Sequence, residues 1–185
     1  MRILILTLLL LVQLSNAQNP YPQDYFRSPL DIPLVFAGTF AELRSNHFHS
    51  GLDIKTQQRE GLNVYAVADG YVSRIKVSFF GYGKALYITH PNGYVSVYAH
   101  LKKFSGAIEA LVKQEQYKQQ SYEIELFPQA GKLPVTKGEV VAFSGNTGGS
   151  AGPHLHFELW YNGALTVSLN KTLFHLKFRL EMCWH

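Results

Sequence analysis

The 185-residue chain contains a single cysteine, Cys183, and this shortage excludes two kinds of feature. No internal disulfide can form, so the hydrophobic core must hold the fold without covalent cross-links. A closed structural zinc site is also disfavoured, because such sites are typically rich in cysteine thiolates. Any metal site in this chain must therefore be built mainly from histidine and carboxylate side chains.

Charged residues are also few, at 16% of the chain, and they form no dense Lys/Arg cluster interleaved with aromatic residues. Nucleic-acid binding is therefore not expected. The formal net charge is +4, and it becomes +3 without Arg2, from 16 basic and 13 acidic residues. This mild excess is compatible with an anionic cell envelope as a partner but does not require one.

Only one long apolar run occurs, over residues 3–12, and it follows Arg2 and precedes the small residues Ser15 and Ala17. This order is typical of a secretory signal peptide. The run is too short for a membrane-spanning helix, which needs about 20 apolar residues. We expect residues 1–17 to be a signal peptide, with export to the periplasm or the cell exterior, association with the cell envelope and no stable membrane insertion.

The rest of the chain has mainly β character. Residues 18–37 carry four prolines and are expected to form an extended lead-in. Short apolar or alternating runs then follow, separated by turn signals such as Asp69-Gly70; they cover residues 64–68, 71–77, 85–90, 94–100 and 135–143. This spacing predicts a mainly β fold, an antiparallel sheet arranged as an open sandwich or barrel.

One segment departs from the β pattern. Ser105 can cap a helix in which Ile108, Leu111 and Val112 fall at helical spacing, and polar helix formers continue to Gln120. We therefore expect a short inserted helical segment around 105–120, made of one or two helices.

Two short motifs carry the chemistry: His49-Ser-Gly-Leu-Asp53 and His154-Leu-His156. Side chains at even spacing share one face of a strand, so each motif can present its metal-binding side chains together. Two imidazoles and a carboxylate, with one position left to water, are the ligand set of a catalytic zinc site. Eight histidines also produce close pairs by chance, so spacing alone leaves ordinary surface or core histidines as the alternative.

The surrounding segments resemble the lysostaphin/LytM-type zinc metallopeptidases, secreted endopeptidases that cut peptide cross-links of bacterial peptidoglycan. The resemblance covers about residues 35–160, and the segments occur in family order. Besides the two motifs they are Val67-Ala-Asp-Gly-Tyr-Val72, Gly81-Tyr-Gly83, His90-Pro-Asn-Gly93, Tyr98-Ala-His-Leu101 and Ser144-Gly-Asn-Thr-Gly148. The resemblance implies a duplicated hybrid motif fold, with the zinc metallopeptidase domain at residues 38–160.

By this resemblance His49, Asp53 and His156 are ligands of Zn²⁺, whereas His100 and His154 are catalytic without binding the metal. The implied substrate is a peptidoglycan peptide, and the sequence leaves open which catalytic histidine acts as the base. Two other functions remain possible: a non-catalytic relative that regulates other wall hydrolases, and a zinc carboxypeptidase acting on cell-wall peptides. Retention of all five site residues argues against the regulator.

Weaker expectations concern residues near the motifs. Arg44 and Asn46 are candidates to contact a peptide carboxylate or to orient a ligand, with an ordinary loop role as the alternative. His47 is a weaker candidate for the groove lining, and His90 is expected to be structural within its hairpin. Tyr98 lies two residues before His100, so it is expected to point into the cleft. The glycines Gly145, Gly148 and Gly149 are expected to shape a groove wall beside the metal.

The C-terminal end departs from the family pattern. Tyr161-Asn-Gly163 supplies a turn, but the usual closing segment with Asn-Pro is missing. Residues 174–180 alternate like an edge strand, with Cys183 expected to be unpaired. Residues 161–185 are therefore expected to be an atypical tail, either a natural short form or a truncation.

Overall fold

A computed structural model of the chain describes residues 22, 24–44 and 48–165. The expected signal peptide, Asn46, His47, the expected strand at 174–180 and Cys183 lie outside these residues. Within the described ranges, no helix combines the length and hydropathy that a membrane crossing requires.

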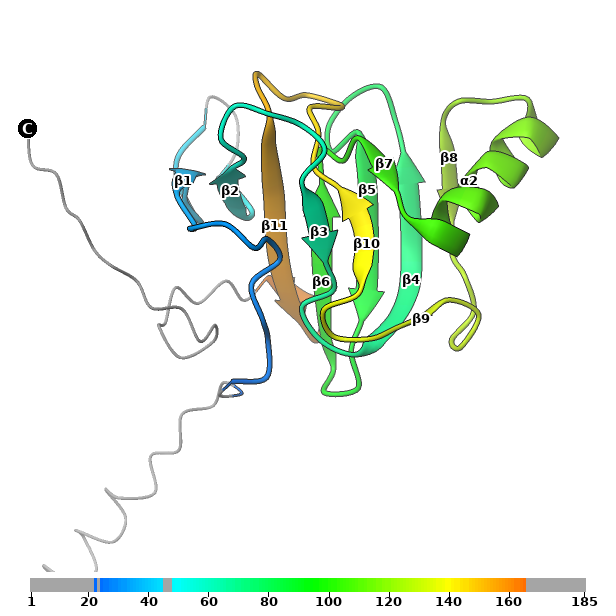
Figure 1. The fold of residues 1–185 in the computed structure, drawn as a ribbon, viewed down its shortest axis with the longest axis horizontal. Helices are drawn as coiled ribbons and strands as arrows, with labels where there is room; N and C mark the ends of the chain where they lie inside the picture. The colour runs from blue at the N-terminus through cyan, green and yellow to red at the C-terminus, as the bar shows by residue number, and fades with distance from the viewer. Residues whose placement is uncertain (1–21, 23, 45–47, 166–185) are drawn as a thin grey trace, which may run out of the picture.

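The larger of two sheets contains nine strands, and all of its pairings are antiparallel (Figure 1). Its main path runs β1 (Phe36–Gly38), β2 (Leu52–Lys55), β11 (His154–Tyr161), β6 (Tyr94–Ala99), β5 (Lys84–Thr89), β4 (Gly70–Val77) and β8 (Ile124–Leu126). Two short strands extend it: β12 (Ala164–Leu165) pairs with β11, and β9 (Pro134–Val135) pairs with β4.

A second sheet of three strands lies in front of the larger one in Figure 1. Its order is β3 (Asn63–Tyr65), β10 (Val140–Phe143) and β7 (Lys103–Phe104). Val64 and Phe104 of this sheet join Leu86 and Phe157 of the larger sheet in one buried cluster. The described strands thus form an open two-layer β fold without a closed barrel, which confirms the fold class predicted from the sequence.

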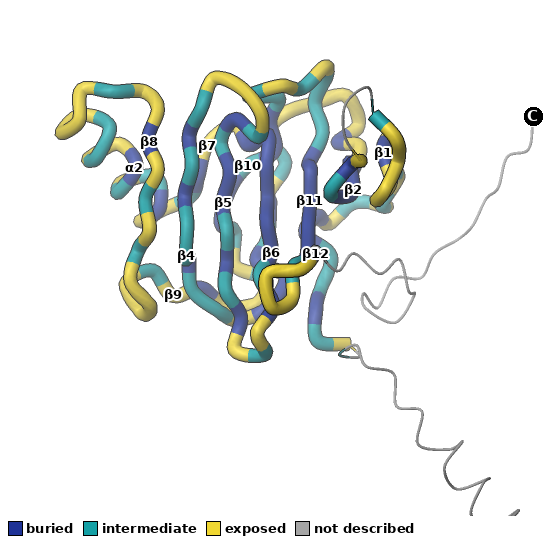
Figure 2. The backbone as a smooth tube through the Cα atoms, turned by 180° about the vertical axis from the view of Figure 1, so that it is seen from behind, coloured by how far each residue is buried: buried dark blue, intermediate teal, exposed yellow. Residues whose placement is uncertain are grey.

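The inserted segment forms the single helix of the described residues, α2 (Gly106–Gln119). Its N-cap is Ser105 in an extended conformation, but the hydroxyl makes no capping hydrogen bond. Ile108 and Val112 are buried, while Figure 2 shows that much of the helix stays exposed. The helix sits beside β8, at the edge of the larger sheet away from β11 (Figure 1).

The lead-in contributes to the core. Phe26 and Leu30 are each 1% exposed, and the Phe26 ring meets the rings of His90 and Tyr94 edge-on. His90 is buried, with its ring nitrogens bonded to the Asp69 carbonyl and the Ser96 hydroxyl, and burial lowers its pKa. His90 therefore has the structural role expected for it.

The sheet register brings the two sequence motifs together. In β11, His156 lies opposite Asp53 of β2 on one side and opposite Ala99 of β6 on the other. Ala99 is the last residue of β6, and His100 follows it directly. Three segments distant in sequence thus meet around His156 near one end of the sheet.

Candidate metal centre and active site

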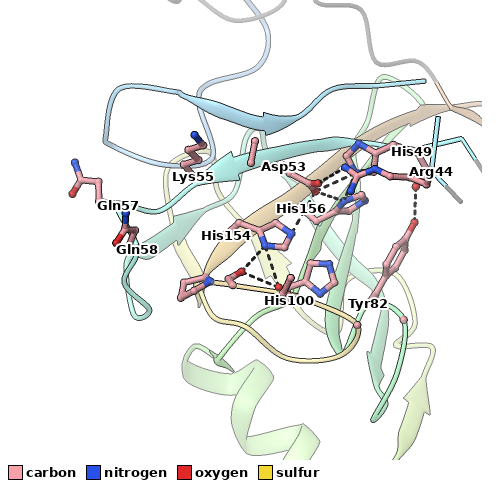
Figure 3. Close-up of a pocket in the computed structure, with 18 residues that line it drawn as sticks. Arg44, His49, Asp53, Lys55, Gln57, Gln58, Tyr82, His100, His154 and His156 are labelled. Carbon is pink, nitrogen blue, oxygen red and sulfur yellow. Dashed lines mark hydrogen bonds and ion pairs between the residues drawn. The ribbon is translucent and has the colours of Figure 1, made fainter. Parts of the chain in front are cut away.

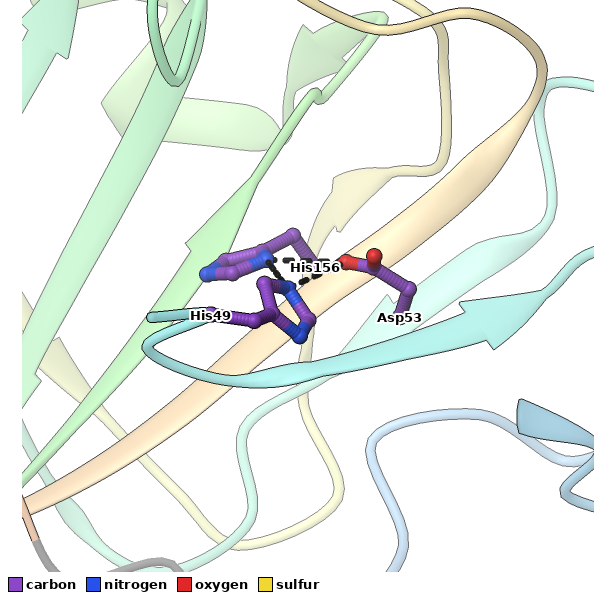
Figure 4. A group of neighbouring side chains, drawn as sticks. All are labelled: His49, Asp53 and His156. Atoms are coloured by element: carbon purple, nitrogen blue, oxygen red, sulfur yellow. Dashed lines mark hydrogen bonds and ion pairs between the residues drawn. The ribbon is translucent and has the colours of Figure 1, made fainter. Parts of the chain in front are cut away.

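Three side chains place one metal-binding atom each within a small triangle (Figure 4). The distances are 3.1 Å between His49 Nε2 and Asp53 Oδ1, 3.1 Å between His49 Nε2 and His156 Nδ1, and 2.9 Å between His156 Nδ1 and Asp53 Oδ1. All three residues are buried. These are the three ligands expected from the sequence, and the structure brings them together.

The other ring nitrogen of each ligand histidine is already engaged. His49 Nδ1 donates to the Thr39 carbonyl at 2.9 Å, and His156 Nε2 donates to Glu158 Oε1 at 2.8 Å. In the neutral rings, each inward nitrogen therefore carries a lone pair. Two lone pairs and a carboxylate oxygen converge on one point, an arrangement that requires a proton or a cation.

The second oxygen of Asp53 is held from the side. Arg44 Nη2 donates to Asp53 Oδ2 at 3.0 Å, which leaves Oδ1 facing the two histidines. Arg44 therefore orients the Asp53 carboxylate, which is one of the roles considered for it. A Cβ at Gly38 would lie 2.4 Å from Arg44 Nη2, so only glycine admits this approach.

The electrostatics of the triangle suit a cation. Burial alone would raise the pKa of Asp53, but hydrogen bonds from His154 and His156, with the charges of His156 and His49, hold it well below its ordinary value. Burial alone would lower the pKa of His156, but its bonds to Asp53 and Glu158 raise it to about 9. Without a metal, the proton on His156 balances the carboxylates.

The donor set fits a metal ion of the zinc type. Tetrahedral bonds of about 2.0–2.2 Å separate ligand atoms by roughly 3.4 Å, slightly more than the separations seen here. The three ligands of a catalytic site leave one position for water or substrate. His49, Asp53 and His156 would hold the ion, with Thr39 and Glu158 fixing the two rings.

His100 lies beside this triangle but outside it. Its Nδ1 donates to the Thr147 carbonyl at 2.8 Å, and its ring centroid is 4.7 Å from that of His154. Burial lowers the pKa of His100 to about 4, with the charges of His154 and His156 acting in the same direction. His100 is therefore neutral at pH 7, with the Nε2 lone pair available to accept a proton.

His154 shares the β11 face of His156. Its Nδ1 donates to the Gly152 carbonyl at 2.8 Å, and its Nε2 lies 3.4 Å from Asp53 Oδ1. One cleft of about 940 Å³, shown in Figure 3, is lined by the three candidate ligands together with His100 and His154. Gly149 and Gly81 also line it, whereas Gly148 packs against the backbone of Gly81 and Gly83.

Two expectations from strand alternation are wrong. Tyr98 does not point into the cleft: it is 0% exposed, and its hydroxyl accepts the Val67 N–H at 3.0 Å. His100 has a left-handed φ of 57° just after β6 ends, so the face rule does not extend to it. His49 likewise precedes β2 and reaches Asp53 through a turn, not along a shared strand.

Supporting residues were missed by the sequence analysis. Glu158 is completely buried, and its carboxylate accepts a hydrogen bond from His156. It lies two residues after His156 on β11, so both side chains share one face of the strand. That even spacing was a usable signal. Thr39 and Thr147 act through backbone carbonyls, for which the sequence carries no signal.

The pKa of His156 predicts how stability varies with pH in metal-free protein. The folded chain holds this proton up to about pH 9, against an ordinary pKa of 6.5. This proton therefore adds to the free energy of unfolding, and its contribution is complete below pH 6.5. As the pH rises to about 9, the free energy of unfolding should fall by on the order of 1–3 kcal/mol. Urea unfolding of chelated protein across this range measures it, and the H156Q variant should lack this loss.

Comparison with known proteins gives an independent result. The profile of Peptidase family M23 matches residues 47–120 and 129–167. An uncharacterized metalloprotease of Haemophilus influenzae is 38% identical over 128 residues, which are 67% of this chain and 22% of the relative. A DD-carboxypeptidase/endopeptidase, Mpg, of Neisseria meningitidis is 36% identical over 121 residues, which are 65% of this chain and 22% of the relative. The chain thus spans about a fifth of the length of either relative.

Among solved structures, a zinc containing peptidase from Vibrio cholerae superposes with a TM-score of 0.57 at 24% identity. The match covers 78% of this chain and 39% of that one, and it shows a shared fold. The family match spans all five histidine and aspartate residues of the site. The chain belongs to Peptidase family M23.

Proposed function

We propose that this chain is a zinc-dependent endopeptidase that hydrolyses peptide cross-links of bacterial peptidoglycan. The observation that carries the proposal is the pair His100 and His154, which lie in the same cleft as a three-ligand metal site without belonging to it. Relatives named metalloprotease and DD-carboxypeptidase/endopeptidase support the same chemistry. The zinc containing peptidase with this fold supports zinc as the ion.

Different side chains of the cleft would serve different steps of peptide hydrolysis. Bound zinc would supply Lewis-acid polarisation of the scissile carbonyl and a lowered pKa for the attacking water. His100, held by Thr147 with its Nε2 lone pair free, would accept the proton of that water. His154 has Nδ1 bonded to Gly152 and Nε2 toward the cleft, and with both ring nitrogens protonated it would donate from Nε2 to the developing oxyanion. Arg44 keeps Asp53 oriented throughout.

The charge of the cleft favours an anionic peptide. Arg44 and Lys55 line it, and among the described lining residues Asp53 is the one carboxylate. These three side chains sum to a net charge of +1, and a divalent cation at Asp53 would raise it to +3. Cell-wall stem peptides carry free carboxylates, which such a lining would attract.

The two alternative functions differ in measurable ways. A non-catalytic regulator has no chemical need for His100 and His154 beside an intact ligand set. A carboxypeptidase would release single terminal residues, and the name of the Neisseria relative includes this activity. We also propose export to the cell envelope, where this substrate lies, on the basis of residues 1–17.

Product analysis on purified peptidoglycan tests the proposal. The protein should convert cross-linked muropeptides to uncross-linked ones, and a chelator should stop the reaction until Zn²⁺ is restored. Release of terminal residues alone would identify a carboxypeptidase. Unchanged muropeptides in the presence of Zn²⁺ would contradict both enzymatic functions.

A further inference from the structure

One buried ionisable group contacts a metal ligand but is neither a ligand nor one of the two remaining cleft histidines. Glu158 is 0% exposed and lies two residues beyond His156 on the same face of β11. A carboxylate removed from water to this degree must be satisfied by hydrogen bonds. Its partners therefore indicate what it does.

Four donors converge on the Glu158 carboxylate. Oε1 accepts from His156 Nε2 at 2.8 Å, from the Ser50 hydroxyl at 2.5 Å and from the Tyr82 hydroxyl at 2.5 Å. Oε2 accepts from Trp160 Nε1 at 2.6 Å. These contacts fix the carboxylate in both position and orientation.

The donors come from separate parts of the site. Ser50 sits between the ligands His49 and Asp53, and Tyr82 belongs to the β4–β5 loop that lines the cleft. The ring of Tyr82 also lies against the ring of His156, with centroids 5.1 Å apart. Glu158 therefore joins the first ligand motif, the cleft loop and β11 at a single oxygen atom.

The remaining freedom of His156 is restricted by packing. A Cβ at Gly51 would lie 2.8 Å from the His156 ring, so the glycine allows the ring to pack tightly against the turn. Packing defines the plane of the ring but not which nitrogen carries the proton. The Glu158 carboxylate decides that point, because it accepts a hydrogen bond from Nε2–H and so leaves the lone pair of Nδ1 for the metal.

We propose that Glu158 is a positioning residue for the metal centre: it holds His156 in the form and orientation that present Nδ1 to the metal, and Ser50 and Tyr82 lock its carboxylate. The inference rests on the proposed metal site. Outer partners of this kind typically contribute 10–100-fold in metal affinity.

Metal titration of the full chain tests the inference. The E158L variant removes the acceptor, and its dissociation constants for Zn²⁺ and Co²⁺ should rise by about 10–100-fold. E158Q keeps a neutral oxygen acceptor and should show a smaller rise. The Co²⁺ absorption spectrum should change in E158L, because the geometry at His156 changes.

A matched control separates positioning from general stability. Ser96 is also 0% exposed and bonds to His90 and Tyr98, away from the metal ligands. The S96A variant should lower the urea midpoint of unfolding without changing metal affinity or the Co²⁺ spectrum. If E158L does not fold, E158Q and Y82F provide the same comparison.

The outcomes are distinct. Wild-type affinity and an unaltered spectrum in folded E158L or E158Q would overturn the positioning role. Absence of metal binding by the unaltered chain would instead refute the proposed function, and with it the ground for this inference. Weakened binding with an altered spectrum, graded from Gln to Leu, would establish the role of Glu158.

Discussion

Replacing Asp53 with alanine should leave the purified chain without bound metal and reduce hydrolysis of peptidoglycan to the level of chelated protein. Asp53 supplies the one anionic ligand, and its Oδ1 lies within 3.1 Å of both ligand nitrogens. Without it, two imidazoles and the adjacent Arg44 guanidinium would face the same point. A divalent cation is repelled by that arrangement. Elemental analysis measures the metal, and muropeptide release measures the activity.

The D53A variant also removes a buried charge, so folding must be checked separately. Circular dichroism and a urea midpoint serve this purpose, and D53N provides a second variant that keeps the shape of the side chain. Asp31 offers a matched control, since it is exposed and paired with Arg27 at the surface. The D31N variant should retain metal and activity. A folded D53A protein with stoichiometric metal would remove Asp53 from the ligand set.

The strand periodicity was enough to predict one part of the site, the pair of histidines on β11. His154 and His156 lie on β11 at i and i+2, and both line the cleft as the alternation rule requires. The β fold itself could be predicted because the runs from 64 to 143 are short, are either apolar or alternating in polarity, and are separated by turn residues. Each of these signals is local, since it depends on neighbours within about eight residues.

The remaining features depend on contacts between distant segments. The register that places His156 opposite both Asp53 and Ala99 joins three strands that are far apart in sequence. Nothing within any one strand specifies that pairing. The family resemblance supplied the ligand set for this reason, and spacing alone left ordinary histidines as an alternative.

Backbone conformation explains the errors. His49 and His100 both lie just outside strands, where the two-residue alternation no longer applies. His100 adopts a left-handed φ of 57°, which turns its side chain into the cleft while Tyr98 stays in the core. A non-glycine residue in this conformation is uncommon and costs free energy, and such strain is found at functional positions. The same change of backbone conformation thus explains both the failed prediction for Tyr98 and the position of His100 in the cleft.

Replacing His100 with asparagine should preserve the metal and abolish most of the activity. Asparagine tolerates the left-handed conformation that His100 adopts, so the backbone of the cleft should be retained. The three metal ligands do not include His100, so metal content should equal that of the unaltered protein. The rate should fall on the order of 10²-fold or more, because a positioned group for proton transfer is lost. The H100A variant should also keep its metal and lose most of its activity, but it should be less stable than H100N.

A second buried histidine supplies the control for this prediction. His90 bonds to Asp69 and Ser96 inside the core, away from the cleft, so H90N should lower stability and leave the turnover of folded protein unchanged. The decisive comparison is metal content against turnover in H100N. Loss of both metal and turnover would indicate that His100 is a metal ligand. Retention of both would show that His100 takes no part in the reaction. Retained metal with lost turnover would separate binding from catalysis, as expected from a neutral ring held by Thr147 at 2.8 Å with its Nε2 lone pair free.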